Sequence, residues 1–106
     1  LYSKNDKDNE ILTKLAIAYY KIGELSIANN TIEKLNNKFK KYQFGEIDYC
    51  LAQYYAAIDD KESSLNHLLK SVAQGYNYTP NTFQNDVHFI KYKNTNEFKK
   101  ILKFWQ

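Results

Sequence analysis

Apolar residues recur every three or four positions along most of this chain, which is the spacing of an amphipathic helix. The clearest example lies between Leu12 and Leu35, where two such stretches meet at Gly23. Glycine accepts the left-handed backbone conformation with which many helices end. The pattern therefore predicts two short helices joined by a tight turn, which is a helical hairpin.

The same reasoning predicts four main helices, each with one apolar stripe to bury. The first runs from Glu10 to Ile22, capped by Asp8 or Asn9, and its stripe is at positions 11, 12, 15, 16, 19 and 22. The second runs from Glu24 or Leu25 to about Lys40, with a stripe of Leu25, Ala28, Ile32, Leu35 and Phe39. The third runs from Glu46 to Ile58, with Ile47, Leu51, Ala52, Tyr55 and Ile58. After a turn at Asp59 and Asp60, the fourth runs from Lys61 to about Gln74 and ends at Gly75, with Leu65, Leu68, Leu69 and Val72.

The last thirty residues have a different character, with short helical turns in place of long helices. Pro80 favours the start of one turn after Thr79 as a cap. A second turn is expected from Asp86 to Tyr92, where Val87, Phe89 and Ile90 are the residues to bury. Asn94, followed three residues later by Glu97, predicts a final helix from Thr95 to about Phe104. Its apolar face consists of Phe98, Ile101, Leu102 and Trp105.

The first hairpin recurs in a weaker form 36 residues later, as from Tyr19 to Tyr55. The first set of matching residues is Leu15, Ala16, Tyr19, Gly23, Ala28, Ile32 and Leu35. Their counterparts are Leu51, Ala52, Tyr55, Asp59, Ser64, Leu68 and Ser71. A hairpin that recurs at a fixed period is typical of proteins built by stacking repeats.

This pattern resembles the tetratricopeptide repeat (TPR) family, whose period is about 34 residues. Leu12 stands where the family often has Trp, and Ala16 and Ala28 stand at its small positions. The second hairpin departs from the family pattern at Asp59, Ser64 and Ser71, and it lacks the terminal proline. The tail is similar to the segment that closes many bacterial TPR arrays, through Gly75, the run Asp86–Phe89 and the run Glu97–Leu102.

The resemblance implies an all-α fold, with antiparallel helical hairpins stacked as a short right-handed TPR-like α-solenoid. We expect one compact domain made of a flexible lead-in (1–9), hairpin 1 (10–41), hairpin 2 (42–75) and a C-terminal capping segment of short helices (76–106). Stable arrays of this kind usually need at least about three units. We therefore expect a longer repeat protein, with an apolar edge along the helix that starts at Ile11.

Composition disfavours several classes of function. All 15 basic residues are lysine, and the net charge is only +3. Arginine provides the bidentate fork used on phosphate and guanine, so its absence disfavours nucleic-acid binding. Cys50 is the single cysteine and cannot form an internal disulfide, which favours a reducing, cytoplasmic location. No apolar run is long enough to predict a membrane span.

The spacing of reactive residues predicts neither catalytic residues, nor a metal site, nor a cofactor. His67 and His88 are the only histidines, and neither has metal-ligand spacing to Cys50 or to the other. Ser63 and His67 lie one helical turn apart without an orienting acid or an oxyanion motif. Asp86 is expected to cap a turn, and Cys50 to be a small buried apolar residue. The chain is therefore predicted not to be an enzyme.

In the TPR family, the first helix of each repeat lines a concave groove that takes a peptide or a partner helix. The residues of this chain that match that face are Thr13, Ile17, Tyr20, Lys21, Tyr49, Gln53 and Ala56. Ile17 and Tyr20 also suit packing against an upstream repeat or the tail. Family members that clamp a carboxylate-terminated tail have Lys and Asn at these positions, so that clamp is not expected here.

The leading hypothesis is a non-catalytic scaffold that binds a peptide or partner protein in this groove. A second is a self-association module in which exposed edges pair two copies. A third is binding of an anionic surface or nucleic acid through the lysines of the tail. The residues of this third hypothesis are Lys91, Lys93, Lys99, Lys100 and Lys103, with Phe98 and Trp105 beside them.

Overall fold

A computed structural model describes residues 2–37, 45–76 and 83–104, with side chains described from Asn9 onward in the first helix. Within these ranges the chain forms helices and turns and no strand, so the predicted all-α class is confirmed. The long helices are α1 (Tyr2–Lys21), α2 (Leu25–Asn36), α3 (Glu46–Ala57) and α4 (Lys61–Ala73). The tail adds the 3-10 helix η2 (Val87–Tyr92) and α6 (Asn96–Leu102).

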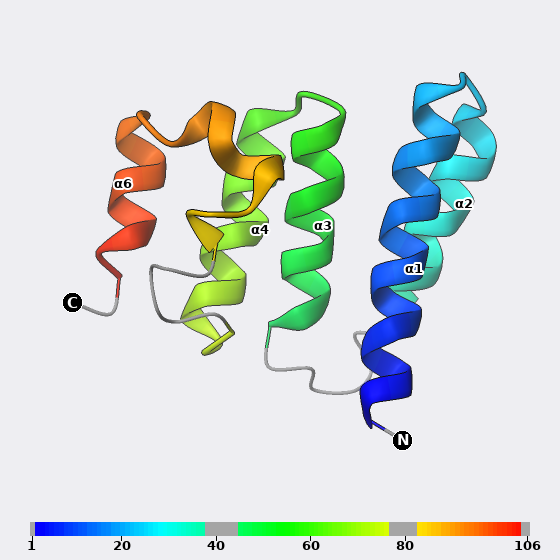
Figure 1. The fold of residues 1–106 in the computed structure, drawn as a ribbon, viewed down its shortest axis with the longest axis horizontal. Helices are drawn as coiled ribbons and strands as arrows, with labels where there is room; N and C mark the ends of the chain where they lie inside the picture. The colour runs from blue at the N-terminus through cyan, green and yellow to red at the C-terminus, as the bar shows by residue number, and fades with distance from the viewer. Residues whose placement is uncertain (1, 38–44, 77–82, 105–106) are drawn as a thin grey trace.

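The long helices form two hairpins, α1 with α2 and α3 with α4, each packed on its own partner. Hairpin 1 (α1 and α2) meets hairpin 2 (α3 and α4) mainly through α1 against α3 (Figure 1). On the other side of hairpin 2, η2 packs on α3 and α6 packs on α4. The result is a flat slab of 38 × 32 × 19 Å, with the two termini at opposite ends.

The turns of the two hairpins have the same backbone hydrogen bonds, 36 residues apart. The Glu24 N–H donates to the Tyr19 carbonyl, and the Asp60 N–H donates to the Tyr55 carbonyl, both at 2.8 Å. Gly23 and Asp59 follow the helix ends at φ +88° and +65°, the left-handed conformation of a helix C-cap. The correspondence seen in the sequence therefore extends to the backbone, with aspartate replacing glycine in the second turn.

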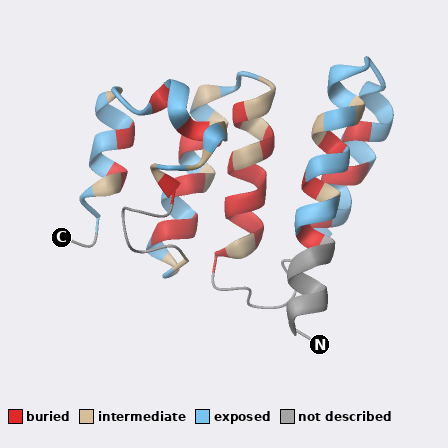
Figure 2. Ribbon diagram, viewed as in Figure 1, coloured by how far each residue is buried: buried red, intermediate tan, exposed pale blue. Residues whose placement is uncertain are grey.

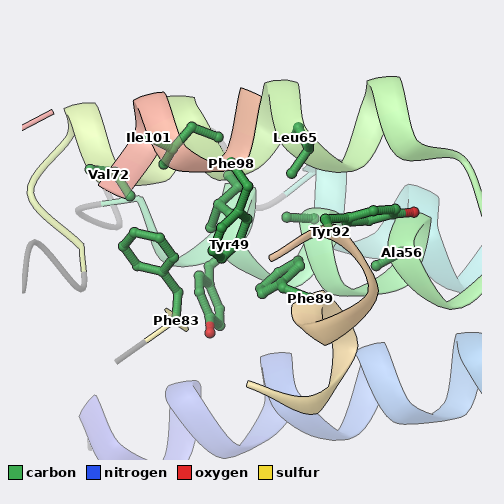
Figure 3. Close-up of a cluster of buried hydrophobic side chains, with 11 residues drawn as sticks. Tyr49, Ala56, Leu65, Val72, Phe83, Phe89, Tyr92, Phe98 and Ile101 are labelled. Atoms are coloured by element: carbon green, nitrogen blue, oxygen red, sulfur yellow. The ribbon is translucent and has the colours of Figure 1, made fainter. Parts of the chain in front are cut away.

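Helix α3 is the centre of the fold, because each of its residues is buried or half-buried (Figure 2). One side of α3 packs into a cluster with hairpin 1. The buried members of this N-terminal cluster are Ala16, Ile32, Leu35, Ile47, Cys50, Leu51 and Tyr54. The other side packs into a cluster with α4, η2 and α6 (Figure 3). The buried members of this C-terminal cluster are Tyr49, Ala52, Ala56, Leu65, Leu68, Val72, Phe83, Phe89, Tyr92, Phe98 and Ile101.

Small residues occupy the same positions inside both hairpins. Ala16 and Ala28 are fully buried in hairpin 1, and so are their counterparts Ala52 and Ser64 in hairpin 2. The Ser64 hydroxyl donates a hydrogen bond of 2.8 Å to the Ala52 carbonyl. Serine is therefore accommodated at this buried position, because its one polar group is paired.

The predicted start of the first helix is wrong. Helix α1 begins at Tyr2, within the expected lead-in, and Asn9 lies inside the helix instead of capping it. The Asn9 side chain is 1% exposed and donates from Nδ2 to Glu46 Oε2 at 2.6 Å. An asparagine is tolerated within a helix when its amide finds a partner, and here the partner is on α3.

Several residues predicted to be buried are exposed instead: Ile11, Leu15, Ile22, Leu25 and Leu69. Among the described elements, hairpin 1 has a neighbour on only one side, so half of the predicted α1 stripe faces outward. The remaining apolar positions of α2 and α4 are buried as predicted, at Ala28, Ile32, Leu35, Leu65, Leu68 and Val72. The predictions for Phe39 and Lys40 fall outside the described residues.

The tail departs from the prediction because its second turn is a 3-10 helix. Residues three apart share a face in such a helix. Phe89 and Tyr92 are therefore buried together, whereas Val87 and Ile90 are 75% and 56% exposed. The cap of α6 is Thr95, which accepts from the Phe98 N–H at 3.2 Å, and not Asn94. The predictions for Thr79, Pro80 and Trp105 fall outside the described residues.

We expect Gly45→Ala to destabilise the fold more than Gly23→Ala. Both glycines have positive φ, which costs alanine roughly 1–2 kcal/mol. A Cβ at Gly45 would lie 2.5 Å from the Ser71 carbonyl oxygen, whereas one at Gly23 meets no atom within 4 Å. Overpacking adds about 1–3 kcal/mol, so urea unfolding should separate the two variants by that amount. Gly75→Ala, also in open space, should behave like Gly23→Ala; equal losses in all three variants would contradict the Gly45 contact.

Candidate functional site

Two hollows lie side by side between α1, α3 and η2, and together we call them the inner groove. The first has a volume of about 340 Å³ and is lined by Glu10, Thr13, Lys14, Ile17, Glu46, Tyr49, Cys50, Gln53, Tyr76 and His88. The second has a volume of about 520 Å³ and is lined by Ile17, Lys21, Ala56, Ala57, Asp59, Val87, His88, Ile90 and Lys91. Ile17 and His88 line both hollows, so the two hollows adjoin at these residues.

Six of the seven predicted groove residues line one hollow or the other. Three of them are buried and lie beneath the surface of the groove: Thr13, Tyr49 and Ala56. Ile17, Gln53 and Lys21 are the members whose side chains reach the surface.

The seventh predicted residue, Tyr20, does not line either hollow. Its ring packs edge-on against Tyr54, with centroids 6.4 Å apart and planes at 87°. Tyr20 therefore makes an aromatic contact between hairpin 1 and α3.

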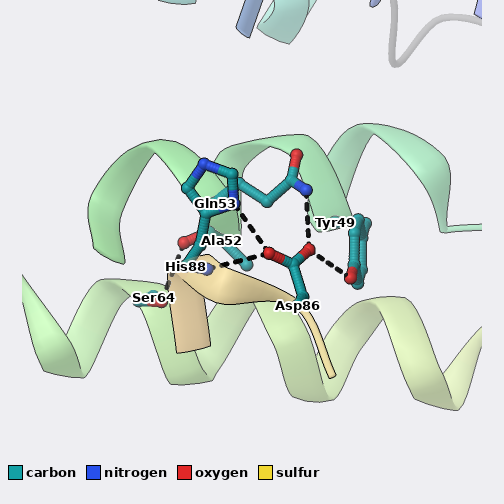
Figure 4. Close-up of polar contacts among 6 residues, drawn as sticks. All are labelled: Tyr49, Ala52, Gln53, Ser64, Asp86 and His88. Carbon is teal, nitrogen blue, oxygen red and sulfur yellow. Dashed lines mark hydrogen bonds and ion pairs between the residues drawn. The ribbon is translucent and has the colours of Figure 1, made fainter. Parts of the chain in front are cut away.

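The wall opposite α1 comes from the tail, which the sequence indicated only as a cap. Asp86, the N-cap of η2, attaches this helix to α3 (Figure 4). Its Oδ2 accepts from the Tyr49 hydroxyl at 2.6 Å and from Gln53 Nε2 at 2.8 Å. Its Oδ1 accepts from the His88 N–H at 2.9 Å and lies 2.7 Å from His88 Nδ1. One carboxylate thus joins η2 to two groove positions of α3.

These contacts shift the pKa values of the network in opposite directions. Burial raises the pKa of Asp86, but the hydrogen bonds from His88, Tyr49 and Gln53 outweigh it and hold that pKa well below its ordinary value. Burial, followed by the hydrogen bond to Asp86, raises the pKa of the Tyr49 hydroxyl far above its ordinary value. Asp86 is therefore a carboxylate at neutral pH, and Tyr49 is a neutral donor to it.

A second tie joins the tail to the end of α3. The Lys91 ammonium donates to the Ala56 carbonyl, in the last turn of α3, and to the Asp59 carboxylate in the following turn. A cation at a helix C-terminus is favourable because the helix dipole is negative there. The hydrogen bond and the positive charge of Lys91 lower the pKa of Asp59.

The charges along the groove are unevenly distributed. Glu46 stands at the end lined by Thr13, where it accepts a hydrogen bond from Asn9. Glu10 and Lys14 form an exposed ion pair of 3.1 Å beside it. Lys21 stands in the other hollow, near Asp59 and Lys91. A chain lying along the groove would therefore meet a carboxylate at one end and an ammonium at the other.

The second histidine, His67 on α4, contacts two residues of α3. His67 Nδ1 lies 2.8 Å from Asp48 Oδ1, and the His67 ring stacks on Tyr55 with planes at 7°. The other Asp48 oxygen accepts from Gln74 Nε2 at 2.8 Å. In the described parts of the chain, no group of three or more His, Cys, Asp or Glu residues is placed to hold a metal ion.

Two tail residues of the anionic-surface hypothesis, Phe98 and Lys91, are engaged within the fold. Phe98 is fully buried in the C-terminal cluster, so it is unavailable to stack on a base. Lys91 is engaged with Asp59 and Ala56, while Lys93, Lys99, Lys100 and Lys103 are exposed. Trp105 falls outside the described residues.

No protein-family model matches the chain. Neither a curated protein nor a solved structure matches it. Within the described ranges, none of the helices combines the length and the apolar character needed to cross a membrane.

We expect the Asp86 network to make stability depend on pH at the acid end. An unfolded aspartate has a pKa of about 3.9, whereas folded Asp86 lies below it. The carboxylate therefore stabilises the fold above about pH 4, and this contribution is lost as pH falls through the folded pKa. The free energy of unfolding of the natural chain should decrease from about pH 5 to pH 2, and in Asp86→Asn it should decrease less.

At neutral pH, Asp86→Asn should cost about 1.5–3 kcal/mol, the usual value of hydrogen bonds to a charged group. Glu33→Gln removes the same charge from the exposed face of α2 and is the matched control. The free energy of unfolding of Glu33→Gln should change with pH in the same way as that of the natural chain. The same pH dependence in Asp86→Asn would show that the network does not control stability in acid.

Proposed function

We propose that this protein is a non-catalytic scaffold that binds an extended peptide, or a segment of a partner protein, in the inner groove. The proposal includes a TPR-like stacking of the two hairpins, in which α1 and α3 are the first helices of successive repeats. The observation that carries it is the meeting of six residues, matched to a groove from the sequence, on two adjoining hollows.

The arrangement of those residues suits a chain lying along the helices. Thr13, Ile17 and Lys21 follow one another at intervals of four along α1, so they form a row that runs along the helix at a shallow angle to its axis. Tyr49, Gln53 and Ala56 form a similar line along α3. A groove between two such lines has the elongated form needed by an extended peptide.

The groove offers both apolar and polar contacts. Ile17 and the exposed Val87 and Ile90 provide apolar surface on both walls. Gln53 and His88, which are half-buried near its middle, provide polar groups. Peptide-binding grooves commonly combine such apolar pockets with a few fixed polar groups. The charges at the two ends favour a peptide with a basic residue near Glu46 and an acidic residue near Lys21.

We expect peptides selected on the protein from a displayed random library to bind through Ile17 and Lys21. Their affinity, measured by fluorescence anisotropy, should fall about fivefold or more in Ile17→Ala and in Lys21→Glu. Such a loss corresponds to about 1 kcal/mol, the scale of one exposed charge pair or a partly buried apolar contact. The matched controls are Ile27→Ala and Lys34→Glu on the exposed side of α2, which should bind like the natural chain.

Two results would contradict the proposal. One is a selection that yields no binding peptide. The other is a set of peptides whose affinity changes equally in the groove variants and in their α2 controls, because binding would then lie outside the groove.

A further inference from the structure

Helix α1 has a second apolar stripe on its outer side. It consists of Ile11, Leu15, Ala18 and Ile22, all of which are exposed. The three large side chains are exposed by 53%, 43% and 71%. At about 100° per residue, the four positions fall within an arc of about 60°. They lie on the side of α1 opposite to the buried Thr13 and Ala16, and we call them the outer stripe.

The outer stripe has a buried counterpart in hairpin 2. The residues 36 positions later are Ile47, Leu51, Tyr54 and Ile58. Three of these are at most 3% exposed, and Ile58 packs against them in the N-terminal cluster. This is the side of α3 that meets hairpin 1. The outer stripe therefore occupies, on α1, the positions by which α3 stacks on the hairpin before it.

On the opposite side of each hairpin, equivalent residues also pack against the element that follows. Hairpin 1 meets α3 through Ala16 and Ile32. Their counterparts Ala52 and Leu68 belong to the C-terminal cluster, which hairpin 2 shares with η2 and α6. Each hairpin thus has two faces at equivalent positions. The leading face meets the hairpin before it, as Ile47 and Leu51 do in hairpin 2, and the trailing face meets the element after it, as Ala16 and Ile32 do in hairpin 1. Both trailing faces are covered, and so is the leading face of hairpin 2, but the outer stripe is not.

We propose that the outer stripe is the stacking surface for one further helical hairpin of the same type, which precedes α1 in the same polypeptide. That hairpin docks on α1 as hairpin 1 docks on α3. Its trailing face carries small and aliphatic residues at the positions equivalent to Leu12, Ala16, Ile32 and Leu35. The inference does not depend on what the inner groove binds.

A second copy of this chain is a poorer occupant, for two reasons. The trailing faces that fit such a stripe are already buried in each copy, by α3 in hairpin 1 and by η2 and α6 in hairpin 2. Two outer stripes facing each other in antiparallel fashion would bring Lys14 and Lys21, which flank the stripe, close to the same lysines of the other copy. Like charges in such register are unfavourable.

The test supplies the missing hairpin. A copy of residues 9–44 is inserted between Asp8 and Asn9 of the full chain, which preserves the 36-residue period. Cys50→Ala removes the natural thiol, and Leu15→Cys in the original hairpin places one thiol in the outer stripe. The rate of maleimide labelling is compared between the natural-length and the extended chain. We expect it to fall about tenfold or more, which corresponds to about 1.4 kcal/mol of protection against local opening.

Asn30→Cys is the matched control. Its counterpart Asn66 is exposed in hairpin 2, which already has a hairpin stacked before it. Labelling at position 30 should therefore be equally fast in both chains. Unchanged labelling of Leu15→Cys would overturn the proposal, as would an added hairpin that proteases digest while the rest of the chain resists.

The oligomeric state of the natural chain gives an independent result. We expect sedimentation equilibrium to show a monomer at low micromolar concentration. A dimer that Leu15→Glu dissociates, while Asn30→Glu does not, would assign the outer stripe to a second copy and overturn the proposal. Failure of either test would leave the inner groove untouched, because the Ile17 and Lys21 variants probe a different face of α1.

Discussion

The burial of α3 from two sides is the constraint on which the rest of this structure depends. Hairpin 1 covers one side through Ala16, Ile32 and Leu35, and α4 together with the tail covers the other through Leu68 and Phe89. Burial of apolar surface stabilises by about 25 cal/mol per Å², and α3 shares in both clusters. Removing either neighbour would therefore expose one side of a helix that has no polar face to present to water.

The tail combines two roles that the sequence indicated separately. Phe89 and Tyr92 close the C-terminal cluster, which is the task of a cap in a stacked fold. On the same short helix, Val87 and His88 line the inner groove. The N-cap of this helix, Asp86, accepts hydrogen bonds from Tyr49 and Gln53. Groove shape and fold stability thus depend on the same carboxylate, since the Asp86 network holds that wall against α3.

Agreement between prediction and structure follows the range of the forces involved. The hairpin turns were predictable because Gly23 and Asp59 act within one turn of backbone. The burial of α3 was only half predictable, since an apolar stripe shows one buried side and not two. Asn9 was wrongly predicted to be a cap, because its partner Glu46 is distant in sequence. Asp86 caps η2 as predicted, but its bond to Tyr49 on α3 could not be predicted for the same reason. Six of the residues that line the inner groove were predicted through the resemblance to the tetratricopeptide repeat, but the wall opposite them was not.

The sequence by itself determined which residues form helices, where the hairpins turn, and that the hairpin occurs twice at a period of 36 residues. These features follow from local propensity and periodicity, which are carried by neighbouring residues. Only the tertiary structure decided which apolar stripes are covered. It buries Ile47 and Leu51 and leaves their counterparts Ile11 and Leu15 in water. The physical reason is that an apolar side chain is buried only where another element lies against it. In the part of the chain that the structure describes, the outer side of α1 has no such neighbour.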